Sequence, residues 1–128
     1  MKYNTDKQEK YTILKLEEEK LDSTISADIK SEFIQLNTNG PKNIILDLSS
    51  VKYTDSSGLS ALLVGNRLFN ENEGAFVLAE VNEHVMKLIK ISMLDKVLDI
   101  LPTVTESVDA VLFHEMETSL KKDQGEEE

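Results

Sequence analysis

Residues 43–48, with the sequence NIILDL, form a nearly continuous run of apolar side chains. Such a run is typical of a central strand covered on both faces, because a strand with one solvated face alternates apolar and polar residues. A strongly apolar helix is predicted to follow at about residues 57–70, and a second buried strand, AFVLA, at residues 75–79. This succession favours an α/β fold.

The alternation of strands and helices continues along the chain. Helical spacing recurs at residues 83–91 and about 105–116, and a short strand at residues 97–101 is expected to end at Pro102. This order predicts right-handed crossovers and a mostly parallel sheet. We therefore expect one α/β domain over residues 1–116, with a mixed, mostly parallel sheet of about 4–5 strands and about 4 helices.

The part of the chain before this alternation is predicted to contribute strands and a helix. YTILKL at residues 11–16 contains β-forming residues, and an earlier strand is expected to begin at Tyr3, which makes the sheet mixed. Ser23 and Thr24 are placed to cap a helix that the Asn-Gly-Pro sequence at residues 39–41 ends. Its predicted apolar stripe is Ile25, Ile29, Phe33, Ile34 and Leu36. The predicted stripe of the last helix is Val108, Val111 and Leu112, with Thr105 or Ser107 as its cap.

The composition narrows the functional classes. A formal net charge of −10 argues against nucleic acid and against an anionic membrane surface, and it would steer a basic protein partner toward the domain. No apolar run approaches the roughly 20 residues that span a bilayer, and the N-terminus lacks the apolar stretch of a secretory signal. We therefore expect a cytoplasmic protein. Without cysteine, thiol nucleophiles and Cys-ligated metals are excluded. Residues 117–128 are expected to form an acidic, disordered tail.

The sequence Asp-Ser-Ser-Gly at residues 55–58 stands where the apolar helix begins. The first turn of a helix has unpaired N–H groups and a partial positive charge, so it favours an anion such as a phosphoryl group on Ser56. Asp55 is expected to cap the helix, to orient the Ser56 hydroxyl, or both. Gly58 removes a side chain, which would let another protein approach closely. Plain helix capping is the alternative interpretation.

The helix after this motif is apolar around most of its circumference. Such a helix is either wrapped on nearly all sides or offers apolar surface to a partner. Its apolar residues are Leu59, Ala61, Leu62, Leu63, Val64, Leu68 and Phe69.

With these motifs the chain resembles a STAS domain of the anti-sigma factor antagonist family. The resemblance covers roughly residues 11–112. It is carried by LDST at residues 21–24, by IILDLSSVKYTDSSGLSALL at residues 44–63, and by the apolar spacing of residues 81–111. The order of these motifs is far more specific than DSSG alone.

The resemblance implies a mechanism of partner switching. It implies that the unphosphorylated protein binds an anti-sigma factor, which is itself a serine kinase, and thereby frees a sigma factor. The kinase would phosphorylate Ser56, with Asp55 supporting that site, and a metal-dependent serine phosphatase would restore the active form. The expected supporting and partner-contacting residues are Ser57, Gly58 and Leu59, together with Asp22, Ser23, Thr24 and Leu62. We expect no cofactor, no metal and no catalytic residue, and a monomer or weak dimer.

The sequence departs from the family pattern at two places. The family often has Gly-Glu-Leu-Asp before the first helix, where Glu-Lys-Leu-Asp stands here at residues 19–22, and Ser57 places a second hydroxyl beside the expected site. STAS domains also occur outside sigma-factor pathways, so a STAS module in another signalling pathway is an alternative.

Two further classes of protein compete with this interpretation. A response-regulator receiver would use an aspartate at the end of a central strand, but Asp47 lies within the apolar run and no lysine follows the last strand. A serine hydrolase would need a Gly-x-Ser-x-Gly elbow, and Thr54 occupies the position of its first glycine. His84 and His114 are interpreted as surface residues. The chain is therefore not expected to be an enzyme.

Overall fold

The computed structural model describes the backbone of residues 1–126 and the side-chain environments of residues 1–122. The elements in chain order are β1 (Tyr3–Lys7), β2 (Thr12–Leu16), β3 (Lys20–Leu21), α1 (Ser26–Asn39), β4 (Ile44–Asp47), β5 (Tyr53–Thr54), α2 (Ser56–Glu71), β6 (Phe76–Ala79), α3 (Glu83–Ile91), the 3₁₀ turn η1 (Leu94–Lys96), β7 (Asp99–Leu101) and α4 (Val104–Glu126).

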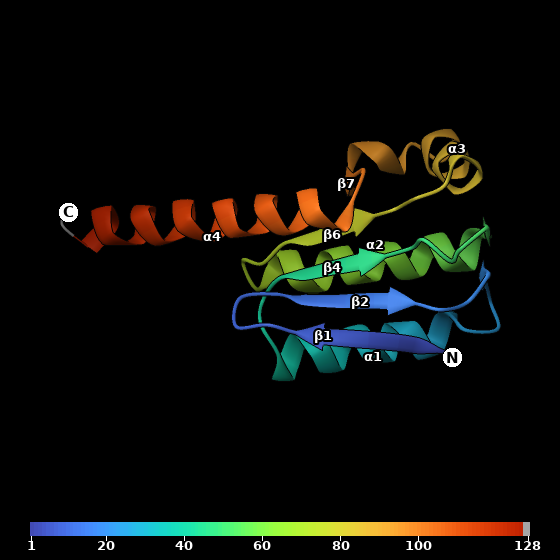
Figure 1. The fold of residues 1–128 in the computed structure, drawn as a ribbon, viewed down its shortest axis with the longest axis horizontal. Coiled ribbons are helices and arrows are strands. Elements are labelled where there is room, and N and C mark those ends of the chain that lie inside the picture. The colour runs from blue at the N-terminus through green and yellow to red at the C-terminus, as the bar shows by residue number, and fades with distance from the viewer. Residues whose placement is uncertain (127–128) are drawn as a thin grey trace.

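The main sheet has five strands in the order β1-β2-β4-β6-β7 (Figure 1). β1 runs antiparallel to β2, while β2, β4, β6 and β7 are parallel to one another. A separate two-stranded parallel ladder joins β3 to β5. The predicted mixed, mostly parallel sheet is confirmed, including the early strand that begins at Tyr3.

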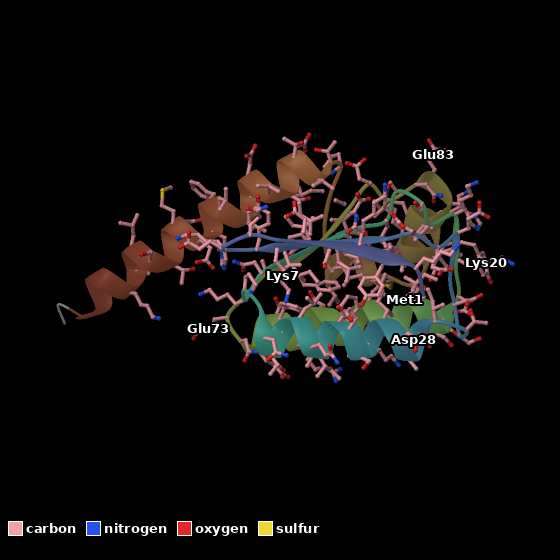
Figure 2. The ribbon with its side chains drawn as sticks, turned by 60° about the horizontal axis from the view of Figure 1, so that its bottom comes forward. Met1, Lys7, Lys20, Asp28, Glu73 and Glu83 are labelled. Carbon is pink, nitrogen blue, oxygen red and sulfur yellow. The ribbon has the colours of Figure 1, made fainter. Side chains whose placement is uncertain are left out.

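Helices cover the two faces of the sheet unequally (Figure 2). α1 and α2 lie on one face, and the first part of α4 lies on the other before the helix runs on past the sheet (Figure 1). On the α1–α2 face, the Phe33 ring meets the Phe76 ring edge-on, with centroids 5.3 Å apart. On the α4 face, Ile45 packs in a smaller cluster with Val111. β4 is therefore buried on both sides, as its apolar run predicts.

The start of α1 differs from the prediction. Ile25 occupies the N-cap position without a side-chain hydrogen bond, so neither Ser23 nor Thr24 caps the helix. Ile34 is 51% exposed. In a helix with 3.6 residues per turn, Ile34 lies about 100° from Phe33 and so points away from the stripe that faces the core.

The last helix also differs from the prediction, first in its N-terminal cap and in its buried stripe. Its first turn is capped by Thr103, whose Oγ1 accepts a hydrogen bond of 3.1 Å from the Glu106 N–H, rather than by Thr105 or Ser107. Ser107 is buried and donates to the Thr103 carbonyl. Leu112, expected in the buried stripe, is 40% exposed.

The helix continues to Glu126, where the sequence predicted a disordered tail from residue 117. Glu, Lys and Leu are strong helix formers, and Glu117 precedes Lys121 by four residues in the favourable order. Residues 127–128 of the predicted tail lie outside the described residues. No helix within residues 1–126 is both long enough and apolar enough to span a bilayer.

Candidate functional site

The chain between β4 and α2 is held by the segment around β3. The backbone N–H groups of Lys52 and Tyr53 both donate to the Glu19 carbonyl oxygen, at 2.8 and 3.2 Å. β5 then pairs with β3, which brings Thr54 opposite Leu21. The strand that leads into the Asp-Ser-Ser-Gly motif is therefore anchored to a segment more than thirty residues earlier in the chain.

Asp55 caps α2, as predicted. Its side chain accepts a hydrogen bond of 3.0 Å from the Gly58 N–H, and its carbonyl accepts one of 3.0 Å from the Leu59 N–H. Ser56 is then the first residue of the helix and is exposed, while Ser57 is half-buried. Among the described residues no hydrogen bond joins the Asp55 carboxylate to the Ser56 hydroxyl, so of the two predicted roles only capping is observed.

Gly58 has a different role from the one expected. A Cβ atom at this position would lie 2.1 Å from the Leu21 carbonyl oxygen and 2.2 Å from Thr54 Oγ1. The missing side chain therefore makes room for the chain's own backbone, and Gly58 is buried. The prediction that it leaves space for another protein was wrong, because β3 already occupies that space.

The close packing of Gly58 on Leu21 also brings residues 21–24, the other segment expected to contact a partner, to the start of α2. The Leu21 carbonyl oxygen accepts hydrogen bonds from Thr54 Oγ1 at 2.8 Å and from the Asp55 N–H at 3.4 Å. Asp22, Ser23 and Thr24 follow directly, and the last two are exposed. The two segments singled out from the sequence thus lie side by side.

Asp22 orders its own turn. Its Oδ1 accepts hydrogen bonds from the Thr24 hydroxyl and from the Thr24 N–H, the latter at 3.0 Å. These two bonds, that from the hydroxyl first, lower the pKa of Asp22 because they favour the ionised carboxylate. The side chain therefore stays charged beside the start of α2.

Two of the expected partner-contacting residues belong to the core instead. Leu62 is 0% exposed and Leu59 is buried. Both side chains face the interior between α1, α2 and the sheet, so neither is available to another protein. α2 was expected either to be wrapped on nearly all sides or to offer apolar surface to a partner, and the structure favours the wrapped helix. Of its apolar residues only Leu63, Val64 and Leu68 are half-buried, and the others are buried.

Tyr53 and His84 form a contact that the sequence did not indicate. Their rings stack with centroids 6.3 Å apart and planes 22° apart, and both side chains are exposed. The Asn82 side-chain amide donates to the Val51 carbonyl at 2.9 Å and so ties the start of α3 to the approach to α2. Figure 2 shows Lys20 and Glu83 at this same end of the molecule. No local motif could reveal a pair so far apart in sequence.

The surface next to the start of α2 is predominantly acidic. A hollow there is lined by Lys2, Glu17, Glu18, Glu19, Lys20, Asp22 and Thr24. The Lys52 ammonium group lies 3.3 Å from Glu19, with both groups largely exposed. Among the side chains of residues 1–122, no group of three or more His, Cys, Asp or Glu is arranged to hold a metal ion.

The strand order, the covering helices and the capped Asp-Ser-Ser-Gly turn define a small α/β domain of the STAS type. The STAS domain profile matches residues 2–107, and the chain belongs to this family. Over 59 residues it is 34% identical to the anti-sigma F factor antagonist of Paenibacillus polymyxa. That match covers 46% of this chain, and the chain spans half the length of this curated relative.

Solved structures share the fold. An anti-sigma-factor antagonist (STAS) domain protein from Planctomyces limnophilus superposes with a TM-score of 0.77 at 20% identity, over 86% of this chain and 97% of the other. The phosphorylated form of the Bacillus cell fate determinant SpoIIAA superposes with a TM-score of 0.65 at 19% identity, over 86% of this chain and 99% of the other. At these identities the similarity establishes the fold.

Proposed function

We propose that this protein is a cytoplasmic anti-sigma factor antagonist that works by partner switching. Unphosphorylated, it binds an anti-sigma factor with serine kinase activity. That kinase transfers the γ-phosphoryl group of ATP to Ser56 Oγ, which loses its proton, and ADP leaves. The phosphorylated protein dissociates, and a serine phosphatase hydrolyses the phosphoester to restore it.

One observation carries this proposal: Ser56 is exposed while the residues around it are held in place. Its neighbours Asp55 and Gly58 are fixed by a capping hydrogen bond and by close packing on Leu21. A kinase can therefore reach the Ser56 hydroxyl without unfolding the turn. The related fold solved in a phosphorylated form supports a phosphorylation switch on this scaffold.

Electrostatics explains how phosphorylation would weaken binding. A phosphoryl group adds about −1.5 to −2 charges at pH 7. The segment whose backbone packs against the start of α2 carries the carboxylates of Asp22 and Glu19. If a lysine or arginine of the partner paired with the phosphate, phosphorylation would strengthen the complex. If the partner instead covers the phosphate without such a cation, the phosphate loses its hydration at a cost of several kcal/mol, and each 1.4 kcal/mol is a tenfold loss of affinity.

The test uses capture followed by reconstitution. Unphosphorylated wild-type protein is used to isolate its partner, which is identified by mass spectrometry, produced and incubated with the protein and ATP. We expect one phosphate, mapped to Ser56, and none in Ser56→Ala. Ser57→Ala is the matched control and should be phosphorylated normally.

Binding is then measured by calorimetry. Ser56→Glu should weaken the complex by at least about tenfold, whereas Ser56→Ala should bind like the wild type. Phosphate on Ser57, or equal affinities of Ser56→Glu and Ser56→Ala, would overturn the switch. A kinase partner that binds no sigma factor would retain the switch but assign the protein to a different signalling pathway.

A further inference from the structure

Exposed large apolar side chains gather on two surfaces that the proposed switch at Ser56 does not use. The first, which we call the α4 stripe, consists of Leu112, Phe113, Met116 and Leu120. The second, the α3–η1 patch, consists of Ile91, Met93 and Val97. Figure 1 shows that α4 runs away from α3 along the length of the molecule, so the two surfaces cannot cover each other within one chain.

The α4 stripe faces away from the sheet. Val111, which packs on the sheet, is 1% exposed, whereas the side chains of the stripe are 40–58% exposed. With 100° between successive residues of a helix, all four lie about 100–200° around α4 from Val111. An apolar face of this kind on a helix that extends past its own domain is typical of a surface that another protein covers.

The border of the α4 stripe is acidic. Three exposed carboxylates lie about 160–240° around the helix from Val111, on or beside the stripe; they are those of Glu106, Asp109 and Glu117. Lys121 and Lys122 instead line a hollow that they share with Glu73, on the side of the helix toward the end of α2. A partner that covers the stripe should therefore carry apolar residues bordered by cations.

The α3–η1 patch is exposed at a position where the backbone favours glycine. Met93 ends α3 with a φ of 62°, in the left-handed region that glycine usually occupies at the end of a helix. The side chain that glycine would lack is 57% exposed, and so packs little on its own domain. Ile91 and Val97 beside it are 72% and 54% exposed.

The border of the α3–η1 patch is basic, in contrast to the net charge of −10 of the whole chain. Residues 86–97 contain three lysines and one aspartate, which gives 3 − 1 = +2. Lys87 and Lys90 line a hollow together with Ile91, and Arg67 lines another with Val97. All of these cations are exposed. The patch thus has the chemistry that the α4 stripe requires of its partner.

We propose that copies of this chain associate head to tail, with the α4 stripe of one copy on the α3–η1 patch of the next. Apolar side chains meet at the centre, and the carboxylates around the stripe face the lysines around the patch. Because the two surfaces differ, each copy keeps one of each kind free, and the contact generates a ring or an open chain of copies.

The area predicts a weak association. A large apolar side chain that is half exposed contributes on the order of 100 Å². Seven of them give roughly 700 Å², and with the charged borders the total approaches the ~1,200 Å² at the lower end of specific interfaces. The chain is therefore monomeric at low micromolar concentration and associates as its concentration rises.

Sedimentation equilibrium of the full chain is the test. Between about 10 µM and 1 mM the average mass should rise continuously, as expected for a weak complex. Ile34→Ser is the matched control, because Ile34 is 51% exposed but lies on α1, and this variant should associate like the wild type. A mass that stays that of one chain up to about 1 mM would overturn the proposal.

Two variants and their mixture distinguish head-to-tail contact from pairing of identical surfaces. Phe113→Ser/Met116→Ser removes the stripe, and Ile91→Ser/Met93→Gly removes the patch with a residue that suits the backbone of Met93. Each variant alone should remain monomeric, and thermal unfolding shows whether each is folded. Mixed in equal amounts, they should form a complex that stops at two chains, because one variant supplies the stripe and the other the patch.

Association of the Ile91→Ser/Met93→Gly variant by itself would mean that α4 pairs with α4, and would overturn the proposal. A mixture that stays monomeric would also overturn it.

Charge reversal tests the borders. Lys87→Glu/Lys90→Glu should weaken the association at least about tenfold, and adding Asp109→Lys/Glu117→Lys to the same chain should restore it. An unchanged association of the first variant, or no recovery in the second, would contradict the proposed pairing of the two surfaces.

Discussion

The Leu21 carbonyl oxygen occupies the space that a side chain on Gly58 would need, 2.1 Å from the position of its Cβ. Because the obstructing atom belongs to the backbone of β3, no rotamer change can relieve the clash. β3 and the first turn of α2 are therefore packed as closely as two backbones allow.

Gly58→Ala should for this reason destabilise the protein by about 1–3 kcal/mol, the usual cost of overpacking. The measurement is urea denaturation followed by circular dichroism. Ser60→Ala, at an exposed position of the same helix, is the control and should change the free energy of unfolding by less than about 0.5 kcal/mol. An equally stable Gly58→Ala protein would contradict the observed packing.

Leu62→Ala should cost about 2–5 kcal/mol, because it removes a fully buried side chain from the main core. Leu63→Ala, at the adjacent half-buried position, should cost less. The comparison of the two unfolding free energies matters more than either value. A larger loss for Leu63→Ala would mean that α2 is rotated relative to the described structure.

The turn formed by Asp22 should make a pH-dependent contribution to stability. Its pKa is lowered from the ordinary value of about 3.9, so the ionised form is favoured in the folded protein. The resulting stabilisation is present above that ordinary value and is lost as the pH falls through the lowered pKa. Thr24→Val should return the pKa of Asp22 toward its ordinary value, measured by carboxyl-carbon resonance titration. Ser23→Ala, the neighbouring control, should not move it.

Deletion of residues 119–128 should change the free energy of unfolding by less than about 0.5 kcal/mol. The reason is that α4 packs on the sheet through its earlier turns, where Val111 is 1% exposed, whereas Leu120 is 56% exposed. Val111→Ala is the contrasting variant and should cost about 0.5–3 kcal/mol. A large loss on truncation would show that the later turns of α4 pack against the domain in solution.

Much of the fold could be predicted from local patterns. The continuous apolar run at β4 required cover on both faces, and the position of Asp55 before an apolar helix predicted its capping role. Local patterns could not resolve which apolar residues face inward near a helix edge. Ile34 and Leu112 were predicted in the buried stripes of their helices but are exposed, because each follows a buried residue by one position, which rotates its side chain by about 100°.

The site was harder to predict because its contacts are long-range. Gly58 meets Leu21, and Tyr53 stacks on His84, across separations that no motif spans. The prediction for Gly58 was wrong for this reason. In the sequence, a glycine that makes room for another protein looks the same as one that makes room for a distant part of its own chain.

The turn beneath Ser56 is clamped from two sides, by the Asp55 cap and by the β3–β5 ladder. A dianion attached to so rigid a platform would leave the backbone of the domain unaltered and would add charge and a few atoms at one point of its surface. The two forms of the protein would then differ at Ser56 and not in the fold. Because the cost of covering the phosphate is a loss of its hydration, their difference in affinity for a partner should persist as ionic strength rises, whereas repulsion between exposed charges would be screened beyond a Debye length of roughly 8 Å at physiological salt.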